Sequence, residues 1–214
     1  MKYLKRFNEK VIQPYDFTIS LEKLRGNSNI TLEDLSDVFN HMDVEFVNVE
    51  YFISKLQTKK EIEMVPVNMP PLLGGIRWGA HNVYTNKMYI CIDEEVFLKS
   101  INSKNKNQML DFLEEILRHE SVHKQQAERR PNIILRNLET SPKDTKKYFS
   151  STDEVMAFAD SFIVQCRKKG LSDDDILDSL RDGKKVSWIQ NVYSGMDSET
   201  QKRFKKYVYQ YIRN

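Results

Sequence analysis

Apolar residues recur along this chain with two different periods, and the period changes near residue 106. Before that point, short stretches of alternating apolar residues predict strands that are separated by turns and short helices. After it, apolar residues recur every three to four positions, which is the period of an amphipathic helix. The pattern therefore predicts a part that contains a sheet at about 1–106 and a helical part at about 107–214.

A hairpin is the clearest strand signal in the first part. Residues 76–82 and 87–93 have the composition of strands, and Thr85-Asn86 is a suitable turn between them. A hairpin of this kind predicts a small, twisted and mostly antiparallel sheet. The weaker signals are a capped helix from Thr31, a strand or helix entry at 44–49, an edge strand at 61–67 and a helix from about Glu94.

One long helix, expected at about 107–130, dominates the second part. Its buried stripe includes Phe112 and Ile116, and His119 and His123 continue that line in steps of seven. Four further helices are expected at about 152–169, 172–181, 185–193 and 198–212. A small sheet followed by helices is an α+β arrangement, and 214 residues suit a single domain that spans 1–214.

The composition is that of a globular domain, with 40% apolar and 30% charged residues. A net charge of +2 is too small to argue for a nucleic acid or a membrane as partner. No stretch approaches the length of a membrane-spanning helix, and the first residues lack the apolar segment of a secretory signal. Cys91 and Cys166 form no disulfide framework, so we expect a cytoplasmic protein.

The most informative stretch is His119-Glu120-Ser121-Val122-His123, which reads H-E-x-x-H and lies within the long predicted helix. Two histidines four residues apart lie on one helical face, so both imidazoles can bind a single metal ion. Glu120 lies close to the same ion and can accept a proton from a water molecule. Because so short a motif also occurs by chance on solvent-facing helices, the position of a third ligand is decisive.

Glu154 is the strongest candidate for that third ligand, since a catalytic zinc usually has three protein ligands and a water. It lies in the first turn of the helix expected at 152–169, and the preceding loop is long enough to bring this helix back beside the first. Five other residues have weaker spacing or context: His41, His81, Cys91, Glu128 and Glu139.

With these motifs the chain resembles the zincin metallopeptidases, and among them the gluzincins, which pair H-E-x-x-H with a downstream E-x-x-A. The second motif begins here at Glu154 and ends at Ala157, and the resemblance covers about residues 76–160. It implies a zincin-like fold, one Zn²⁺ held by the two histidines and Glu154, and Glu120 as general base. A small phage-encoded member of this group fits the composition, which is rich in Asn and Lys.

Hydrolysis of an amide also needs a donor for the developing oxyanion, and His81, Tyr84 and Tyr148 are the candidates. By the same resemblance, strand 78–82 is the sheet edge that would pair with an extended peptide substrate. Two aspartates are candidates for orienting a zinc-bound histidine: Asp153 and Asp160.

The leading interpretation is a zinc-dependent metallopeptidase acting on a peptide or protein substrate. The alternative is a non-enzymatic structural or binding protein on the same scaffold. A third interpretation, a nucleic-acid partner, depends on the basic and aromatic segment 201–211. There Phe204, Val208 and Tyr211 follow helical spacing, which favours an ordinary amphipathic helix. The sequence leaves open the oligomeric state, the cleavage specificity and the identity of the native metal.

Overall fold

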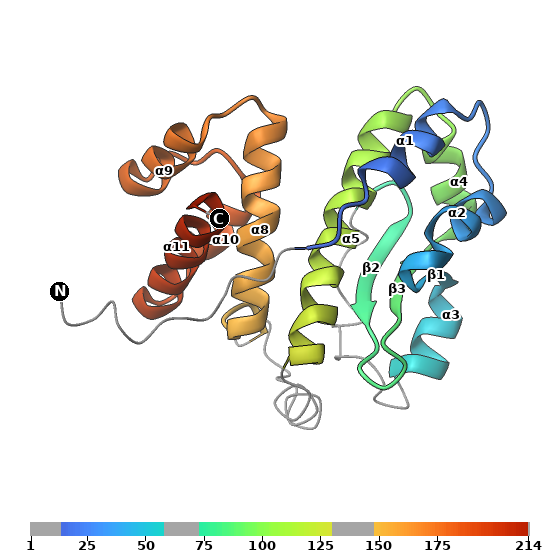
Figure 1. Cartoon of the computed structure of the whole chain (residues 1–214), viewed down its shortest axis with the longest axis horizontal. Helices are drawn as coiled ribbons and strands as arrows, with labels where there is room; N and C mark the ends of the chain where they lie inside the picture. Colours follow the sequence, from blue (N-terminus) through green and yellow to red (C-terminus); the bar gives the residue numbers. More distant parts are fainter. Residues whose placement is uncertain (1–13, 58–72, 130–147, 214) are drawn as a thin grey trace.

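The computed structural model describes residues 14–57, 73–129 and 148–213. In these ranges the protein is α+β, and a three-stranded sheet precedes the longest helix, as the sequence predicts. Figure 1 shows that helices α5 (Lys106–Arg129) and α8 (Thr152–Lys168) run side by side through the middle of the molecule. The sheet lies on the far side of α5, and the last three helices lie on the far side of α8.

The sheet consists of β1 (Val44–Asn48), β2 (Ile76–His81) and β3 (Met88–Ile92), in the order β1-β3-β2. The predicted hairpin is confirmed, because β2 and β3 are antiparallel and Asn86 in their turn has a positive φ of 58°. The expected strand at 61–67 lies outside the described residues.

The expectation of a mostly antiparallel sheet is wrong, because the sheet is mixed and β1 pairs with β3 in parallel. The alternation of apolar residues predicts a strand but carries no information on its direction. In the order of the strands, the second strand of the hairpin, rather than the first, lies beside β1.

The central strand β3 is buried along its whole length, since all five of its residues are inaccessible to solvent. One face of the sheet packs with helices α1 (Thr18–Gly26), α2 (Leu32–Phe39), α4 (Glu94–Ile101) and α5. The other face forms a smaller cluster in which Phe52 stacks on Trp78. Helix α2 begins with the predicted cap, a reciprocal pair of hydrogen bonds between Thr31 and Asp34.

Short helical turns flank the first strand. A 3₁₀ turn at Asn40–Met42 precedes β1 and places His41 on the surface. After β1 the chain forms the one-turn helix α3 (Val49–Tyr51), which continues as a π-helical segment at Phe52–Gln57. These turns place Phe52 under the sheet, where its side chain is buried.

Helix α5 spans Lys106–Arg129, in agreement with the predicted long helix. Helix α8 (Thr152–Lys168) also begins where it is expected, because Ser151 caps it by accepting a hydrogen bond from the backbone N–H of Glu154. Three helices follow and pack with α8 in a second core: α9 (Asp173–Asp182), α10 (Trp188–Ser194) and α11 (Ser198–Arg213).

Two details of this last region test the expectations further. Helix α10 starts later than the sequence pattern indicates, because the side chain of Ser187 accepts a hydrogen bond from the N–H of Ile189 and begins the helix there. In α11, Phe204, Val208 and Tyr211 are buried as expected. None of the helices in the described part of the chain is both long and apolar enough to cross a membrane.

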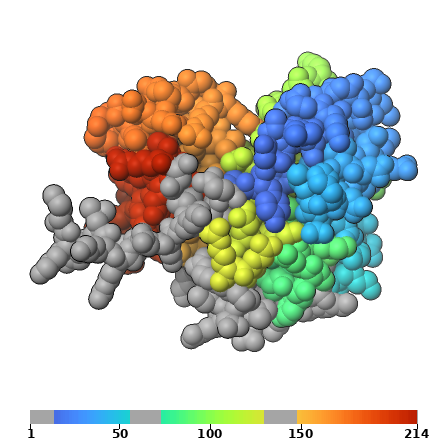
Figure 2. All heavy atoms as spheres, viewed as in Figure 1, coloured from blue at the N-terminus to red at the C-terminus, as the bar shows by residue number. Residues whose placement is uncertain are grey.

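The two cores give the molecule two lobes. On the face shown in Figure 2, helices α8 and α9 (orange) and the first helices (blue) form separate masses with a notch between them. The C-terminal residues of α5 (yellow) come to the surface below that notch. The candidate site lies where α5 meets α8, between these lobes.

Candidate metal centre

The two histidines of the motif lie one turn apart on α5 and face the same way. Their Nε2 atoms are 3.1 Å apart, and their rings meet edge to face at a centroid distance of 4.8 Å. Both side chains are only partly buried, with 12% and 15% of their surface exposed. An i, i+4 pair in this arrangement presents two nitrogen ligands to one point.

Glu154 reaches that point from α8. One carboxylate oxygen lies 3.1 Å from His123 Nε2, and the other lies 3.4 Å from His119 Nε2. The Ser151 cap fixes the first turn of α8, so the carboxylate is presented by a rigid helix end. The structure therefore brings together the three residues predicted as ligands, with their ligand atoms within 4.8 Å of one another.

The surroundings of Glu154 show that the three residues fit a metal ion. Its side chain is 1% exposed, and neither carboxylate oxygen receives a hydrogen bond of normal geometry. Burial alone would raise the pKa of this carboxyl, but the imidazoles of His123 and His119 hold it below its ordinary value. A buried carboxylate that is ionised needs a positive charge beside it, which either protonated imidazoles or a metal ion bound among the three side chains can supply.

Gln126, which the sequence analysis did not single out, determines which nitrogen of His123 is free. Its Oε1 lies 2.9 Å from His123 Nδ1, so Nδ1 donates and the lone pair is left on Nε2, the atom that faces Glu154. Its Nε2 donates to the backbone carbonyl of Asp153 at 3.2 Å. One fully buried amide thus orients a ligand on α5 and ties it to the first turn of α8.

A signal for Gln126 is present in the sequence, because it lies three residues after His123 and so on the same helical face. The expectation concentrated instead on aspartates. Asp160 does not contact a histidine nitrogen; it forms a two-pronged ion pair with Arg118, at 3.1 and 3.3 Å. Asp153 contributes its backbone carbonyl to Gln126. Both aspartates therefore join α5 to α8 near the ligands.

We call His119, His123 and Glu154 the ligand cluster. Glu120 lies beside the ligand cluster and against the sheet. Its side chain is 6% exposed and packs under Gly79 of β2, where an added Cβ would come within 2.6 Å of Glu120 Oε1 and 2.7 Å of its Cγ. Only a glycine at this position of the strand leaves room for the carboxylate. Burial raises the pKa of Glu120, and the neighbouring charge of Glu154 adds to the shift. A carboxyl with a raised pKa is suited to accepting and returning a proton.

The three candidates for an oxyanion donor lie in different environments. His81 is buried near His123; its Nε2 lies 3.0 Å from Asn86 Oδ1, and burial lowers its pKa to about 4. Tyr148 lines a pocket beside His119. Tyr84 is 65% exposed and makes its turn contact only through its backbone N–H. His81 and Tyr148 are therefore near the cluster, and Tyr84 points to solvent.

The competing ligands do not join the cluster. Cys91 is fully buried under the sheet, and burial raises its pKa to about 12, which makes it a poor metal ligand. Glu128 is exposed and accepts a hydrogen bond from Asn86. His41 is exposed on its 3₁₀ turn, and Glu139 lies outside the described residues.

A pocket of about 330 Å³ opens beside His119 and Glu120. Its walls come from β2, α5, α8 and the start of α10, and they are mostly apolar and aromatic. Both tryptophans of the chain, Trp78 and Trp188, line it, and the ring of Phe158 connects Trp188 to His119. A molecule or side chain bound in this pocket would therefore lie next to the ligand cluster.

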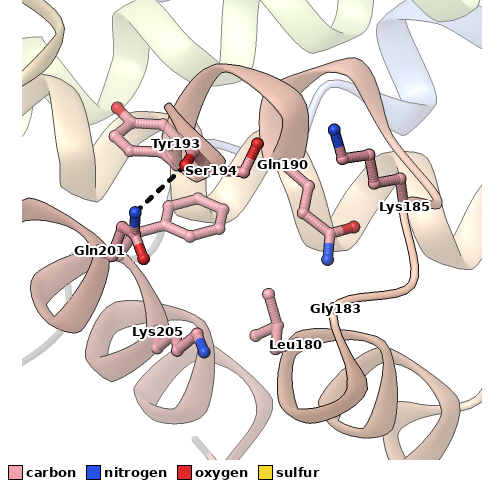
Figure 3. A pocket seen from close by; sticks show the side chains of 9 residues that line it. Leu180, Gly183, Lys185, Gln190, Tyr193, Ser194, Gln201 and Lys205 are labelled. Atoms are coloured by element: carbon pink, nitrogen blue, oxygen red, sulfur yellow. Dashed lines mark hydrogen bonds between the residues drawn. The ribbon is translucent and has the colours of Figure 1, made fainter. Parts of the chain in front are cut away.

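A second, smaller pocket of about 150 Å³ lies away from the cluster, between α9, α10 and α11 (Figure 3). The two amide side chains that line it are engaged within the fold. Gln201 donates to the backbone carbonyls of Ser194 and Met196, and Gln190 donates to that of Ser179. The contacts of these amides brace the helix ends.

Comparisons with models of known protein families, with curated proteins and with solved structures found no match.

Proposed function

We propose that the protein is a zinc-dependent metallopeptidase of zincin-like type, with His119, His123 and Glu154 as zinc ligands and Glu120 as general base. The observation that carries the proposal is the position of Glu120. A metal site that serves stability alone needs closed coordination and no neighbouring base. Here a buried carboxylate with a raised pKa lies between the ligand cluster and a strand, beside a pocket that opens to solvent.

The proposed chemistry assigns a separate task to each group. A bound zinc ion supplies a Lewis acid, which polarises the substrate carbonyl and activates water. The Glu120 carboxylate takes the proton of the attacking water and returns it to the leaving amine. Gln126 keeps the proton of His123 on Nδ1, so that Nε2 remains a ligand throughout. His81 and Tyr148 are the candidates for hydrogen-bond donor to the oxyanion.

The strand above the site supports a peptide as substrate. Among the described residues, β3 is the only strand that pairs with β2, apart from an isolated bridge between Leu73 and Ile76, and Trp78 and Gly79 of β2 line the pocket. An extended peptide can add to such an edge through main-chain hydrogen bonds, which places one of its amide bonds over Glu120. The same strand thus positions the base and the substrate.

The proposal is tested with the zinc-loaded protein and fluorescein-labelled casein as substrate. Glu120→Gln keeps the size and the hydrogen-bonding capacity of the side chain but cannot take a proton. We expect it to bind one zinc per chain, as the wild type does, and to lose at least about 100-fold in hydrolysis rate. Equal hydrolysis rates for the two proteins would overturn the proposal. A wild-type protein that binds no zinc when zinc is supplied in excess would also overturn it.

A non-enzymatic protein with a structural metal is the second candidate, favoured by the full burial of Glu154 and Gln126. Chelation separates the two. A structural site should lose its fold with the metal, because metal binding then supplies folding free energy. A catalytic site in this protein should leave both hydrophobic cores intact, since they form without the ligands, and should lose activity alone. Circular dichroism before and after chelation distinguishes the outcomes.

A further inference from the structure

We propose that the pocket beside the ligand cluster binds a single aromatic side chain of the substrate, next to the bond that is hydrolysed. We call it the aromatic pocket and define it by Trp78, Phe158 and Trp188, with His119 and Glu120 at its inner side. The inference rests on the proposed function and adds the substrate class: peptides with tyrosine or phenylalanine beside the scissile bond.

The first argument is the arrangement of the rings. The Phe158 ring lies 4.5 Å from the His119 ring and 5.9 Å from that of Trp188, with an interplanar angle of 83° for the second pair. Phe149 adds a third contact to Phe158 at 5.4 Å. Aromatic rings prefer such tilted and edge-to-face contacts, so a further ring is well accommodated here. Because Phe158 touches a predicted ligand, the occupant lies beside the reacting bond.

The second argument is size and access. A volume of about 330 Å³ is at the lower end of ligand pockets, which suits one large side chain rather than a folded ligand. Trp188 is 48% exposed although its neighbour Ile189 is fully buried. The indole of Trp188 therefore lines the pocket and is also in contact with solvent.

The third argument is charge and hydrogen bonding. Glu115 and Glu120 both line the pocket, so an acidic side chain is repelled. A basic side chain would lose its hydration among the rings, and one oxygen of Glu115 already accepts a hydrogen bond from Gln165. Trp78 and Ser161 line the pocket, and in the described part of the chain their buried Nε1 and Oγ atoms have no hydrogen-bond partner. A tyrosine hydroxyl is one group that can satisfy them.

Binding is measured with the zinc-loaded full chain and a series of N-acetylated amino-acid hydroxamates, which place one side chain beside a zinc-binding group. The two tryptophans report occupancy by fluorescence, because both line the pocket. We expect the tyrosine and phenylalanine compounds to bind at least about 10-fold more tightly than the alanine, aspartate and lysine compounds. Equal affinities, or a preference for lysine or aspartate, would overturn the aromatic pocket.

Trp188→Ala should reduce this preference by at least about 5-fold with zinc content unchanged, since the indole lies outside the ligand set. Trp78 remains as the fluorescent reporter in that variant. Tyr209→Ala is the matched control, because Tyr209 is also a partly exposed aromatic residue on a helix of the same lobe, 39% exposed, but does not line the pocket. An equal effect of both variants would contradict the assignment.

A second readout separates this inference from the proposed function. A synthetic peptide library is incubated with the zinc-loaded protein, and the cleaved bonds are read by mass spectrometry. Enrichment of tyrosine and phenylalanine on one side of the bond supports both proposals, whereas cleavage without enrichment overturns the aromatic pocket alone. An aromatic preference in hydroxamate binding without cleavage of any peptide overturns the peptidase and leaves the pocket standing.

Discussion

At His123 the candidate metal centre is surrounded by polar groups, whereas at His119 it is surrounded by aromatic rings. Gln126 accepts the Nδ1 proton of His123, and His81 lies nearby. His119 packs on Phe158 instead, and among the described residues no hydrogen bond holds its Nδ1. Under the proposed function, the polar groups at His123 would orient the ligands, and the aromatic rings at His119 would contact the substrate.

The largest effect should come from Glu154, because its carboxylate faces both His119 and His123. Glu154→Gln keeps the shape of the side chain but removes the negative charge that faces both histidines. We expect the affinity for zinc to fall by more than about 100-fold, because even an outer partner of a ligand contributes about 10- to 100-fold. Isothermal titration with zinc measures it.

Glu199→Gln is the matched control, since Glu199 lies in the first turn of α11 as Glu154 lies in the first turn of α8, but is exposed. Without metal, Glu154→Gln should be less stable than the wild type, because the imidazoles of His119 and His123, which hold the pKa of Glu154 below its ordinary value, lose the carboxylate that they face. A variant that binds zinc as tightly as the wild type would remove Glu154 from the ligand set.

Gly79→Ala tests the position of Glu120, whose side chain packs against Gly79. The added Cβ would meet the side chains of Glu120 and Ile116 at 2.6 to 2.8 Å, so the base must move. We expect kcat to fall by about 100-fold with zinc affinity unchanged, because a displaced base costs proton transfer and not metal binding. Gly26→Ala is the control, as its Cβ would meet nothing within 4 Å. A normal kcat in Gly79→Ala would show that Glu120 does not act from this position.

Gln126→Leu should disturb only the polar surroundings of His123. The substitution keeps the volume of the side chain but removes the acceptor for His123 and the donor to Asp153. We expect zinc affinity to drop by about 10- to 100-fold, with the preference for aromatic hydroxamates retained. Gln108→Leu, at an exposed position of the same helix, is the control. A changed side-chain preference without a change in zinc affinity would contradict these separate roles.

The smallest effect concerns pH. Burial holds the pKa of His81 at about 4, below its value of 6.5 in the unfolded chain, so the unfolded state binds more protons between these values. Stability should therefore fall as the pH drops below about 6.5, by about 2 kcal/mol at pH 5. Urea unfolding at several pH values measures this slope, and His81→Gln should flatten it. An unchanged slope in the variant would place the sensitivity elsewhere.

The sequence predicts the elements well where one helical or alternating pattern sets them. The long helix, the hairpin and the first turn of α8 lie close to their expected positions, because local patterns and caps determine them. The trio of His119, His123 and Glu154 follows from one motif and one capped helix start. The parallel pairing of β1 with β3 does not follow, since strand direction depends on the crossover of a distant segment.

The residues that the sequence did not reveal act through contacts between elements. Gln126 matters because its amide reaches the backbone of α8, and Gly79 matters because β2 passes directly over Glu120. Neither contact follows from the spacing of residues within one helix or one strand. Tyr84 shows the converse case, since a suitable residue type in the hairpin turn points to solvent and not toward the metal centre.

The central claim is that three residues from two helices hold one metal ion. A crystal structure of the zinc-loaded protein, with anomalous diffraction recorded on both sides of the zinc absorption edge, tests it most directly. We expect one anomalous peak per chain, within about 2.0 to 2.2 Å of both histidine Nε2 atoms and of a Glu154 oxygen. A peak bound to other residues, or no peak at this position in metal-replete crystals, would contradict the account.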